Sequence, residues 1–350
     1  MKYRKLGDSG IEVSLICLGT MTWGEQNNQD ESFAQMDYAL DRGVNFWDAA
    51  EMYPIPVKAE TYGETERCIG NWFAKNGRRD EVILASKVTG RSNREWIRDG
   101  QETRVNKKQI RQALEGSLKR LKTDYIDLYQ VHWPDRRMGL WGEGAGSYVH
   151  KDESDEAPIL EAMETLSGLV WEGKIRKIGV SNETPWGIGK YLEASEHHGY
   201  PRIVSVQNSY SLLNRIYEIG LSEFSFRENI GLLAYSPLAM GTLSGKYQGG
   251  VVPENSRMAL FPNFLTRYTT AVAQQAIESY VQLAEAYSLT PTALSLGFIN
   301  TRPFVTSNII GATNLAQLKE NIDSVEVEIS EDLEQAIQQI HLVCKNPAAV

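Results

Sequence analysis

The stretch IRQALEGSLKRLKTDYIDLYQVH, residues 110–132, contains the unit from which the fold of this chain is predicted. Its first part places apolar or small side chains on one helical face, at the spacing i, i+3, i+4, i+7, i+8 and i+11: Ile110, Ala113, Leu114, Ser117, Leu118 and Leu121. Residues 126–131 are mostly apolar without strict alternation, which is typical of a parallel strand buried on both faces. The stretch therefore predicts a helix followed by a buried strand that ends at His132.

The same pattern recurs along the whole chain. Short β-rich runs, separated by amphipathic stretches, occupy residues 15–18, 44–47, 82–84, 126–131, 177–180, 203–206, 232–235 and 308–310. Thr184-Pro185 and Thr290-Pro291 mark helix starts, because each places a capping hydroxyl before a proline at the first helical position. This alternation predicts an α/β protein with a single (β/α)8 TIM-barrel domain over residues 1–350. An open doubly wound sheet has the same local pattern, but no GxGxxG motif follows the first predicted strand, so we favour the barrel.

Two further features fit a barrel. Residues 1–13 alternate around Asp8-Ser9-Gly10, which predicts an N-terminal β-hairpin that closes the bottom of the barrel. Three connections that follow predicted strands, residues 54–64, 91–105 and 134–157, are longer than a barrel needs. They are expected at the C-terminal face, where barrels build their substrate sites.

The composition limits the class of protein. With 350 residues, 42% of them hydrophobic, one hydrophobic core can stabilise the chain without disulfides or a structural metal ion. A net charge of -9 argues against a nucleic-acid or anionic-membrane partner. Cys17, Cys68 and Cys344 are odd in number and lack CxxC pairs, which argues against disulfides and a metal site. No leader and no apolar run of ~18 residues is found. We therefore expect a cytoplasmic protein, a monomer by default.

Polar residues follow three consecutive predicted strands. Asp48, Lys87 and His132 stand at strand ends, and Tyr53 lies in the loop just beyond Asp48. Each has an ordinary explanation when taken alone, as a turn residue, a solvent-exposed lysine, a structural histidine and a packing tyrosine. Because parallel strands end at the same face of a barrel, the four together predict one convergent polar site.

These residue types suit the reduction of a carbonyl group. Hydride addition builds negative charge on oxygen, so a proton donor must lie within hydrogen-bond reach. Tyr53 can donate, but the reference pKa of tyrosine is about 10, and a cation ~4 Å away would lower it by about three units. Lys87 supplies the cation, and Asp48 would keep that lysine charged. His132 would orient the carbonyl as a neutral donor; whether Tyr53 or His132 gives the proton stays open.

At these residues the chain resembles the aldo-keto reductases, whose Asp, Tyr, Lys and His tetrad matches Asp48, Tyr53, Lys87 and His132. Segments similar to the family follow in family order: LGTMTWGEQ (18–26), NFWDAAEMY (45–53), ASK (85–87), YIDLYQVHWP (125–134), KIRKIGVSN (174–182), LLAYSPLAMGTLSGKY (232–247) and IIGATNLAQLKEN (309–321). AEMYPIP (50–56) and SLLNR (211–215) resemble the bacterial Tas-type branch, which is near the potassium-channel β subunits. The resemblance spans nearly the whole chain.

The resemblance implies reduction of small aldehydes or ketones with NADP(H) held across the strand ends. The cofactor positions that it implies are Thr20, Met21, Asp48, Ser181, Asn182, Gln207, Tyr235, Ser236, Pro237, Leu238, Gly241, Leu243, Lys246, Arg257, Gly311, Thr313, Gln317, Glu320 and Asn321. Gly311-Ala312-Thr313 leads into a helix after the last strand, and helix N-termini bind phosphate, although an ordinary helix cap has the same sequence. Many relatives carry an arginine for the 2'-phosphate where this chain has Gln317, so a preference for NADPH over NADH rests on Arg257, Thr313 and the resemblance to the branch.

The substrate pocket and two alternatives complete the expectations. Trp23, Tyr53, Trp133 and Trp141 suggest a pocket for an apolar or aromatic carbonyl, although aromatic side chains also pack barrels. The extra stretch 54–64 directly after Tyr53 would shape specificity. The main alternative is a cofactor-binding regulatory subunit with little turnover. A metal-dependent hydrolase is disfavoured, because no second histidine stands at a strand end and Lys87 would crowd a cation.

Overall fold

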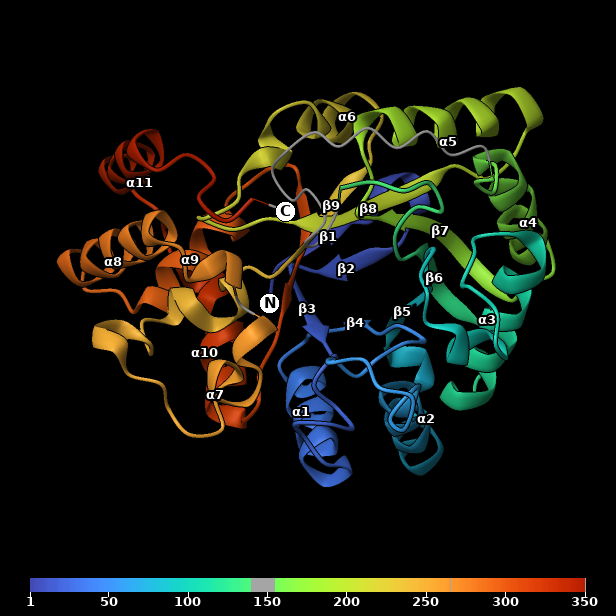
Figure 1. Cartoon of the computed structure of the whole chain (residues 1–350), viewed down its shortest axis with the longest axis horizontal. Coiled ribbons are helices and arrows are strands. Elements are labelled where there is room, and N and C mark those ends of the chain that lie inside the picture. The colour runs from blue at the N-terminus through green and yellow to red at the C-terminus, as the bar shows by residue number, and fades with distance from the viewer. Residues whose placement is uncertain (140–154, 265, 350) are drawn as a thin grey trace.

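Eight parallel strands close into a barrel at the centre of the molecule (Figure 1). The structure is a computed structural model that describes residues 1–139, 155–264 and 266–349. Around the barrel the strands follow the order β10, β3, β4, β5, β6, β7, β8, β9. Their bounds are β3 Ile16–Gly19, β4 Phe46–Asp48, β5 Ile83–Val88, β6 Ile126–Val131, β7 Ile175–Ser181, β8 Ile203–Ser209, β9 Gly231–Tyr235 and β10 Val305–Ile310. The predicted (β/α)8 barrel is confirmed.

The strands are buried on both faces, as expected for a parallel sheet. Every residue of β4, β6 and β10 is buried. Strand β10 begins at Val305, earlier than the predicted residue 308, because its first residues include hydroxyl side chains that hide the apolar pattern. Ser307 satisfies its buried hydroxyl by donating to the Ser14 carbonyl at 2.7 Å.

Helices surround the barrel (Figure 1). The α-helices are α1 Gln29–Asp41, α2 Glu64–Asn76, α3 Lys107–Leu121, α4 Ile159–Trp171, α5 Pro185–His198, α6 Leu221–Arg227, α7 Arg257–Leu260, α8 Ala271–Ala286, α9 Pro291–Asn300, α10 Leu315–Asp323 and α11 Glu331–Val343. Short 3-10 helices lie at Gly7–Ser9, Arg79–Glu81, Glu95–Arg98, Ile216–Glu218, Ala239–Ser244, Gln248–Gly250, Pro262–Phe264, Thr266–Tyr268 and Ser324–Glu326. None of the helices among the described residues has the length and apolar character needed to cross a membrane.

Local sequence signals set the helix boundaries. The stripe read from residues 110–121 is the inner face of α3, with Ile110 and Leu114 fully buried. Thr184 and Thr290 cap α5 and α9 as predicted, since their side chains accept hydrogen bonds from the backbone N–H groups of Gly187 and Ala293.

The N-terminal segment is the predicted antiparallel hairpin, β1 Tyr3–Lys5 paired with β2 Glu12–Ser14. Its Leu6 and Val13 are fully buried, in one cluster with strand residues that include Phe46 and Leu128. The hairpin therefore contributes apolar side chains to a packed barrel interior, which leaves polar chemistry to the opposite strand ends.

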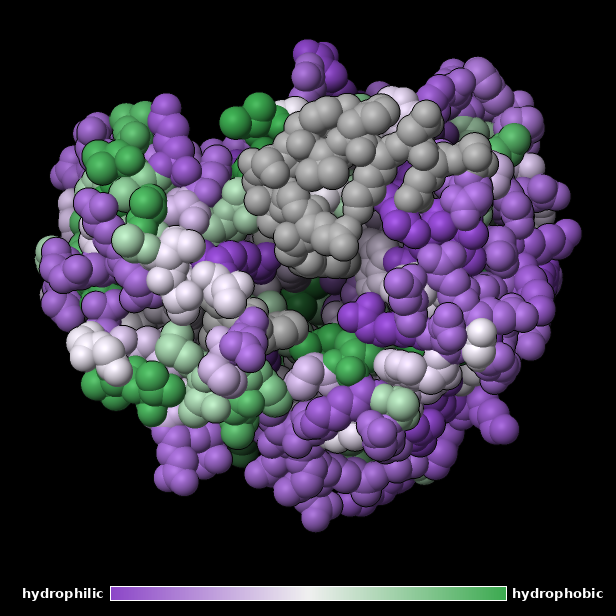
Figure 2. Space-filling model, viewed as in Figure 1, coloured by the Kyte–Doolittle hydropathy of each residue, from purple (hydrophilic) through white to green (hydrophobic). Residues whose placement is uncertain are grey.

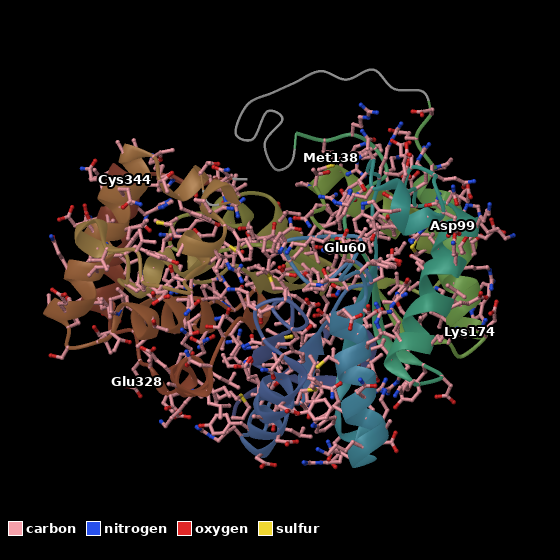
Figure 3. All side chains as sticks on the ribbon, turned by 60° about the horizontal axis from the view of Figure 1, so that its bottom comes forward. Glu60, Asp99, Met138, Lys174, Glu328 and Cys344 are labelled. Atoms are coloured by element: carbon pink, nitrogen blue, oxygen red, sulfur yellow. The ribbon has the colours of Figure 1, made fainter. Side chains whose placement is uncertain are left out.

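Strand register brings the carboxyl ends of the strands to one side of the barrel. Asp48 pairs with Gly19 of β3 and with Ala85 of β5, and Lys87 pairs with Gln130 of β6. In Figure 3, Met138, which follows β6, lies at the top of the view, and Lys174, which precedes β7, lies below it. The loops after the strands are thus separated from the loops before them.

Candidate active site

A buried ion pair forms the centre of the polar site. The Lys87 ammonium donates to Asp48 Oδ2 at 2.6 Å and to the Ala49 carbonyl at 2.8 Å. The side chains of Lys87 and Asp48 are 0% and 4% exposed. Burial alone would lower the pKa of Lys87, but the Asp48 carboxylate outweighs burial and the pKa is raised. Lys87 is therefore an ammonium held inside the barrel, as the sequence predicts.

Two amide side chains complete the environment of Asp48. Gln207 Nε2 donates to Asp48 Oδ1 at 2.9 Å, and Gln130 Nε2 donates to the same oxygen at 3.3 Å. Gln207 is one of the positions that the resemblance implies for the cofactor, whereas Gln130 is not. The only sequence signal of Gln130 is a polar side chain within the mostly apolar strand 126–131. Both amides compensate the buried carboxylate without adding charge.

Tyr53 lies against both Lys87 and His132. The Lys87 Nζ atom is 5.0 Å from the centre of the Tyr53 ring, and the His132 ring meets that ring edge-on at 5.7 Å. Burial raises the pKa of Tyr53, the Lys87 charge lowers it, and the net direction is upward. The expectation that Lys87 brings this pKa toward neutrality is therefore corrected: the lysine acts in the predicted direction, but burial outweighs it.

His132 is a neutral group in this site. Burial lowers the pKa of His132 well below its usual value, and the positive charges of Lys87 and Arg94 lower it further. Its Nδ1 atom is buried and has no hydrogen-bond partner among the described residues. A neutral imidazole beside Tyr53 is what the predicted orienting role requires.

A second buried ion pair joins two of the long loops. Arg98 donates to both carboxylate oxygens of Glu51, at 2.9 and 2.6 Å, and both side chains are at most 2% exposed. The Glu51 carboxylate also accepts the Thr89 N–H at 2.7 Å and the Tyr62 hydroxyl at 3.1 Å. The connection after β4, which carries Tyr53, is thereby fixed to the connection after β5. No local sequence pattern indicates this pair, because its partners are 47 residues apart along the chain.

The polar positions at the ends of β7, β8 and β9 lie beside Asp48 and His132. Ser181 donates to the Gln207 carbonyl at 2.7 Å, and Asn182 donates to the His132 carbonyl at 2.9 Å. The Tyr235 hydroxyl donates to Asn182 Oδ1 at 2.8 Å. The positions predicted for the nicotinamide end of a cofactor are therefore joined by hydrogen bonds.

The two N-terminal cofactor positions also lie against this site. Thr20 donates its hydroxyl to the Asp48 carbonyl at 2.8 Å. The Met21 carbonyl accepts the Ile55 N–H at 2.9 Å, which connects it to the loop that follows Tyr53.

The loop after β9 has an unusual backbone. Ser236, Ala239, Met240 and Gly241 have φ values of 55°, 48°, 60° and 96°. Non-glycine residues with positive φ are costly and cluster at functional sites, and turns of this kind turn successive N–H groups toward anions. The predicted positions Pro237 and Leu243 are buried in this loop, and Leu238 is half-buried.

Two cations flank this loop. A Cβ atom on Gly241 would lie 3.0 Å from Lys246 Nζ, so glycine leaves the ammonium room. Arg257 contacts Met240 Sδ at 3.0 Å and Gln26 Oε1 at 3.4 Å, and it pairs with no carboxylate among the described residues. Burial lowers the pKa of Arg257. A half-buried guanidinium that has no carboxylate partner in the described part of the chain is suited to an anionic ligand.

The start of α10 is an ordinary helix cap. Asn314 is the N-cap residue, and the Gln317 side chain accepts the Thr313 N–H at 2.9 Å. Asn321 donates to the Gly311 carbonyl at 3.0 Å, and Glu320 accepts the Thr290 hydroxyl at 2.7 Å. The predicted adenosine positions lie together, with these polar groups bonded within the protein.

The aromatic residues predicted for the pocket differ in their placement. Trp23 is fully buried and donates to Gln35 at 3.3 Å, so it packs in the core and does not line an accessible pocket, which corrects the expectation. Trp133 lies beside His132 with ring centres 5.0 Å apart and packs in a small apolar cluster with Tyr53. Trp141 lies outside the described residues. Figure 2 shows apolar side chains in the hollow at the middle of the viewed face, with hydrophilic side chains around it.

Comparison with known proteins identifies the family. The model of the Aldo/keto reductase family matches residues 15–341. The chain belongs to this family. It is 47% identical to Protein tas of Escherichia coli, over 99% of this chain and 100% of that protein. It is 28% identical to a probable voltage-gated potassium channel subunit beta of Arabidopsis thaliana, over 97% of both chains. It is 29% identical to Aldo-keto reductase yakc [NADP(+)] of Schizosaccharomyces pombe, over 99% of this chain and 92% of that protein.

These matches confirm the resemblance drawn from the motifs, including the likeness to both Tas and the channel β subunits. Membership of the aldo/keto reductase family makes the chain an oxidoreductase by relationship. Its barrel brings Asp48, Tyr53, Lys87 and His132 into one cluster.

Neutral His132 predicts an acid sensitivity of stability in this reductase. Its pKa in the folded protein lies below that of the unfolded chain, so below pH ~6.5 the unfolded state takes up a proton that the folded state does not. Stability should fall by up to about 1.4 kcal/mol per pH unit below that value, and His132→Gln should remove this contribution. Urea unfolding at pH 7 and pH 5.5 measures it, with His197→Gln on the exposed surface as the control. Equal pH dependence in wild type and His132→Gln would contradict the buried neutral histidine.

Proposed function

We propose that this aldo/keto reductase is an NADP(H)-dependent carbonyl reductase that converts aldehydes or ketones to alcohols, with Tyr53 as the general acid. The observation that carries the proposal is the position of Tyr53, half-buried and in contact with both the Lys87 ammonium and neutral His132. A protonated phenol beside a fixed cation can protonate a developing alkoxide, which is a stronger base than phenolate.

Each residue of the tetrad has one task in this proposal. The nicotinamide cofactor supplies the hydride when it is bound. His132 orients the carbonyl oxygen and Tyr53 Oη gives it a proton as negative charge develops there. Lys87 stabilises the phenolate that remains on Tyr53, and Asp48 keeps Lys87 charged and in place. The ammonium therefore acts most strongly after proton transfer has begun, which favours the transition state over the ground state.

The cofactor assignment rests on the residues around the loop after β9. Arg257 and Lys246 would hold phosphate groups there, and Ser181, Asn182 and Gln207 would hold the nicotinamide end. The relative from Schizosaccharomyces pombe carries NADP(+) in its name, which favours the phosphorylated cofactor.

Arg257→Gln is expected to weaken NADPH binding by about ten- to a hundredfold, because a charge-assisted contact to phosphate is lost. NADPH fluorescence titration measures the dissociation constant. Arg227→Gln, which removes an exposed arginine of α6, is the matched control. Unchanged affinity in Arg257→Gln would show that the Arg257 guanidinium does not contact the cofactor phosphate.

Steady-state oxidation of saturating NADPH with a panel of aliphatic and aromatic aldehydes and ketones tests the reaction itself. Turnover of at least one carbonyl is the expected result. Tight NADPH binding without turnover of any carbonyl would instead favour the cofactor-binding regulatory subunit, in line with the channel-subunit relative.

We also propose that the chain forms a single domain and works as a monomer in the cytoplasm, as we expect from the sequence. Analytical ultracentrifugation checks the oligomeric state.

A further inference from the structure

The connection after β5 is docked against the catalytic residues. A Cβ atom on Gly90 would lie 2.2 Å from the Trp133 carbonyl oxygen, so only glycine permits this approach. The Trp133 indole N–H donates to the Arg91 carbonyl at 2.8 Å. Ile97 packs in one apolar cluster with Trp133 and Tyr53. Residues 90–97 are thus fixed at both ends beside the site.

Arg94 lies between these two anchors. Its carbonyl accepts the Ile97 N–H at 3.0 Å, and its side chain is exposed. Within the described part of the chain, no hydrogen bond or ion pair involves its guanidinium. Desolvation lowers the pKa of Arg94, and no carboxylate of the described residues offsets this effect. The positive charge of Arg94 also lowers the pKa of His132. The guanidinium is therefore a charge that has no partner among residues 1–139, 155–264 and 266–349, on a loop that packs against the site.

The other charges around Tyr53 cancel. Lys87 is paired with Asp48, and Arg98 is paired with Glu51. His132 is neutral. Of these groups, Arg94 is therefore the cation whose charge no carboxylate of the described residues offsets, in a chain whose net charge is -9. Such a local charge attracts anions to a cleft that the rest of the protein would repel.

Arg94 also differs from two other arginines, Arg4 and Arg257, that have no carboxylate partner among the described residues. Arg4 also has a pKa lowered by burial, but it donates to the carbonyls of Asn300 and Arg302 at 2.7 and 2.9 Å. Arg257 contacts Met240 and Gln26 beside the loop after β9. Of these three, only Arg94 combines donors that are free in the described part of the chain with a place on the loop that packs against Trp133 and Tyr53.

We propose that Arg94 binds an anionic group of the substrate, so that the enzyme prefers carbonyl compounds that also carry a carboxylate or phosphate. This inference rests on the proposed carbonyl reduction. The planar guanidinium can present two parallel N–H donors to an oxyanion, a geometry that a neutral ester cannot match. Arg94 then determines specificity while the tetrad performs the chemistry.

Matched substrate pairs test this preference. The value of kcat/KM for 4-formylbenzoate is expected to exceed that for its methyl ester by about ten- to a hundredfold. A comparison of 3-formylbenzoate with its methyl ester changes the distance between the aldehyde and the carboxylate. A comparison of glyceraldehyde 3-phosphate with glyceraldehyde separates recognition of phosphate from recognition of carboxylate. Arg94→Gln should bring the charged-to-neutral ratio near one, and Arg94→Lys should leave an intermediate ratio. Arg227→Gln, with the same change of charge, should keep the wild-type ratio.

The outcomes separate this inference from the proposed reaction. Turnover of charged and neutral aldehydes at equal efficiency, or a ratio that Arg94→Gln leaves unchanged, overturns the role of Arg94 and leaves carbonyl reduction standing. If no carbonyl is reduced, the anion site is tested by binding alone. The NADPH-loaded wild type and Arg94→Gln are each titrated calorimetrically with 4-formylbenzoate and with its methyl ester. Preferential binding of the anion that is lost in Arg94→Gln supports the anion site although the reductase proposal has failed. Equal binding by both proteins overturns the site as well.

Discussion

Tyr53→Phe is expected to lower kcat for carbonyl reduction by about a hundred- to ten-thousandfold, the range for loss of a general acid. The ring remains, so its contacts with Lys87 and His132 remain, and only the hydroxyl is removed. That hydroxyl is needed where negative charge develops, not where the cofactor is held. The dissociation constant for NADPH should therefore stay within about twofold of wild type. Stopped-flow measurement of single-turnover NADPH oxidation gives the rate, and fluorescence titration gives the affinity.

A control and a rival assignment accompany this variant. Tyr191→Phe removes another buried hydroxyl, from α5, and should leave kcat unchanged. His132→Gln should reduce kcat less than Tyr53→Phe, because it removes orientation and leaves the acid in place. The opposite order would assign the proton to His132, and an equal loss of rate and of NADPH affinity in Tyr53→Phe would show a binding role.

Lys87→Met is expected to destabilise the protein by about 3–5 kcal/mol in addition to reducing turnover. The Asp48 carboxylate would remain 4% exposed with its positive partner gone, and the amides of Gln207 and Gln130 carry no compensating charge. A buried charge left without its partner is more costly than a buried pair that was never present. Urea unfolding followed by tryptophan fluorescence measures the change.

The double variant distinguishes this cause from lost packing. Asp48→Asn combined with Lys87→Met removes both charges and should recover much of the stability lost in Lys87→Met, without recovering activity. Lys319→Met, which breaks an exposed pair with Asp323, should change stability much less. If the double variant is no more stable than Lys87→Met alone, an uncompensated charge is not the main cause of the destabilisation.

The sequence anticipated the fold because its signals are local and repeated. The helix over residues 110–121 follows from side-chain spacing, and the starts of α5 and α9 follow from the threonine and proline that cap them. Parallel strands place their carboxyl ends together, so residues as distant as Asp48 and His132 could be expected in one cluster before any contact was known.

Other features of the site depend on contacts that no local pattern encodes. Trp23 looked like a pocket residue from its neighbourhood in the sequence, yet it packs against α1 through Gln35. Glu51 and Arg98 are ordinary charged residues of two long loops, and only the folded chain makes them a buried pair. Gln130 lies in a mostly apolar predicted strand, and only the folded chain shows that its amide donates a hydrogen bond to Asp48.

By itself, then, the sequence determined the barrel, its hairpin and the residues that stand at the strand ends, because hydrophobic periodicity and capping act over a few residues. Only the tertiary structure decided the electrostatic state of those residues. The pKa of Tyr53 is raised although Lys87 lies beside it, since burial and every nearby charge add through space. For the same reason the structure alone distinguished Arg94, whose charge has no partner among the described residues, from Arg98, whose charge is cancelled by Glu51.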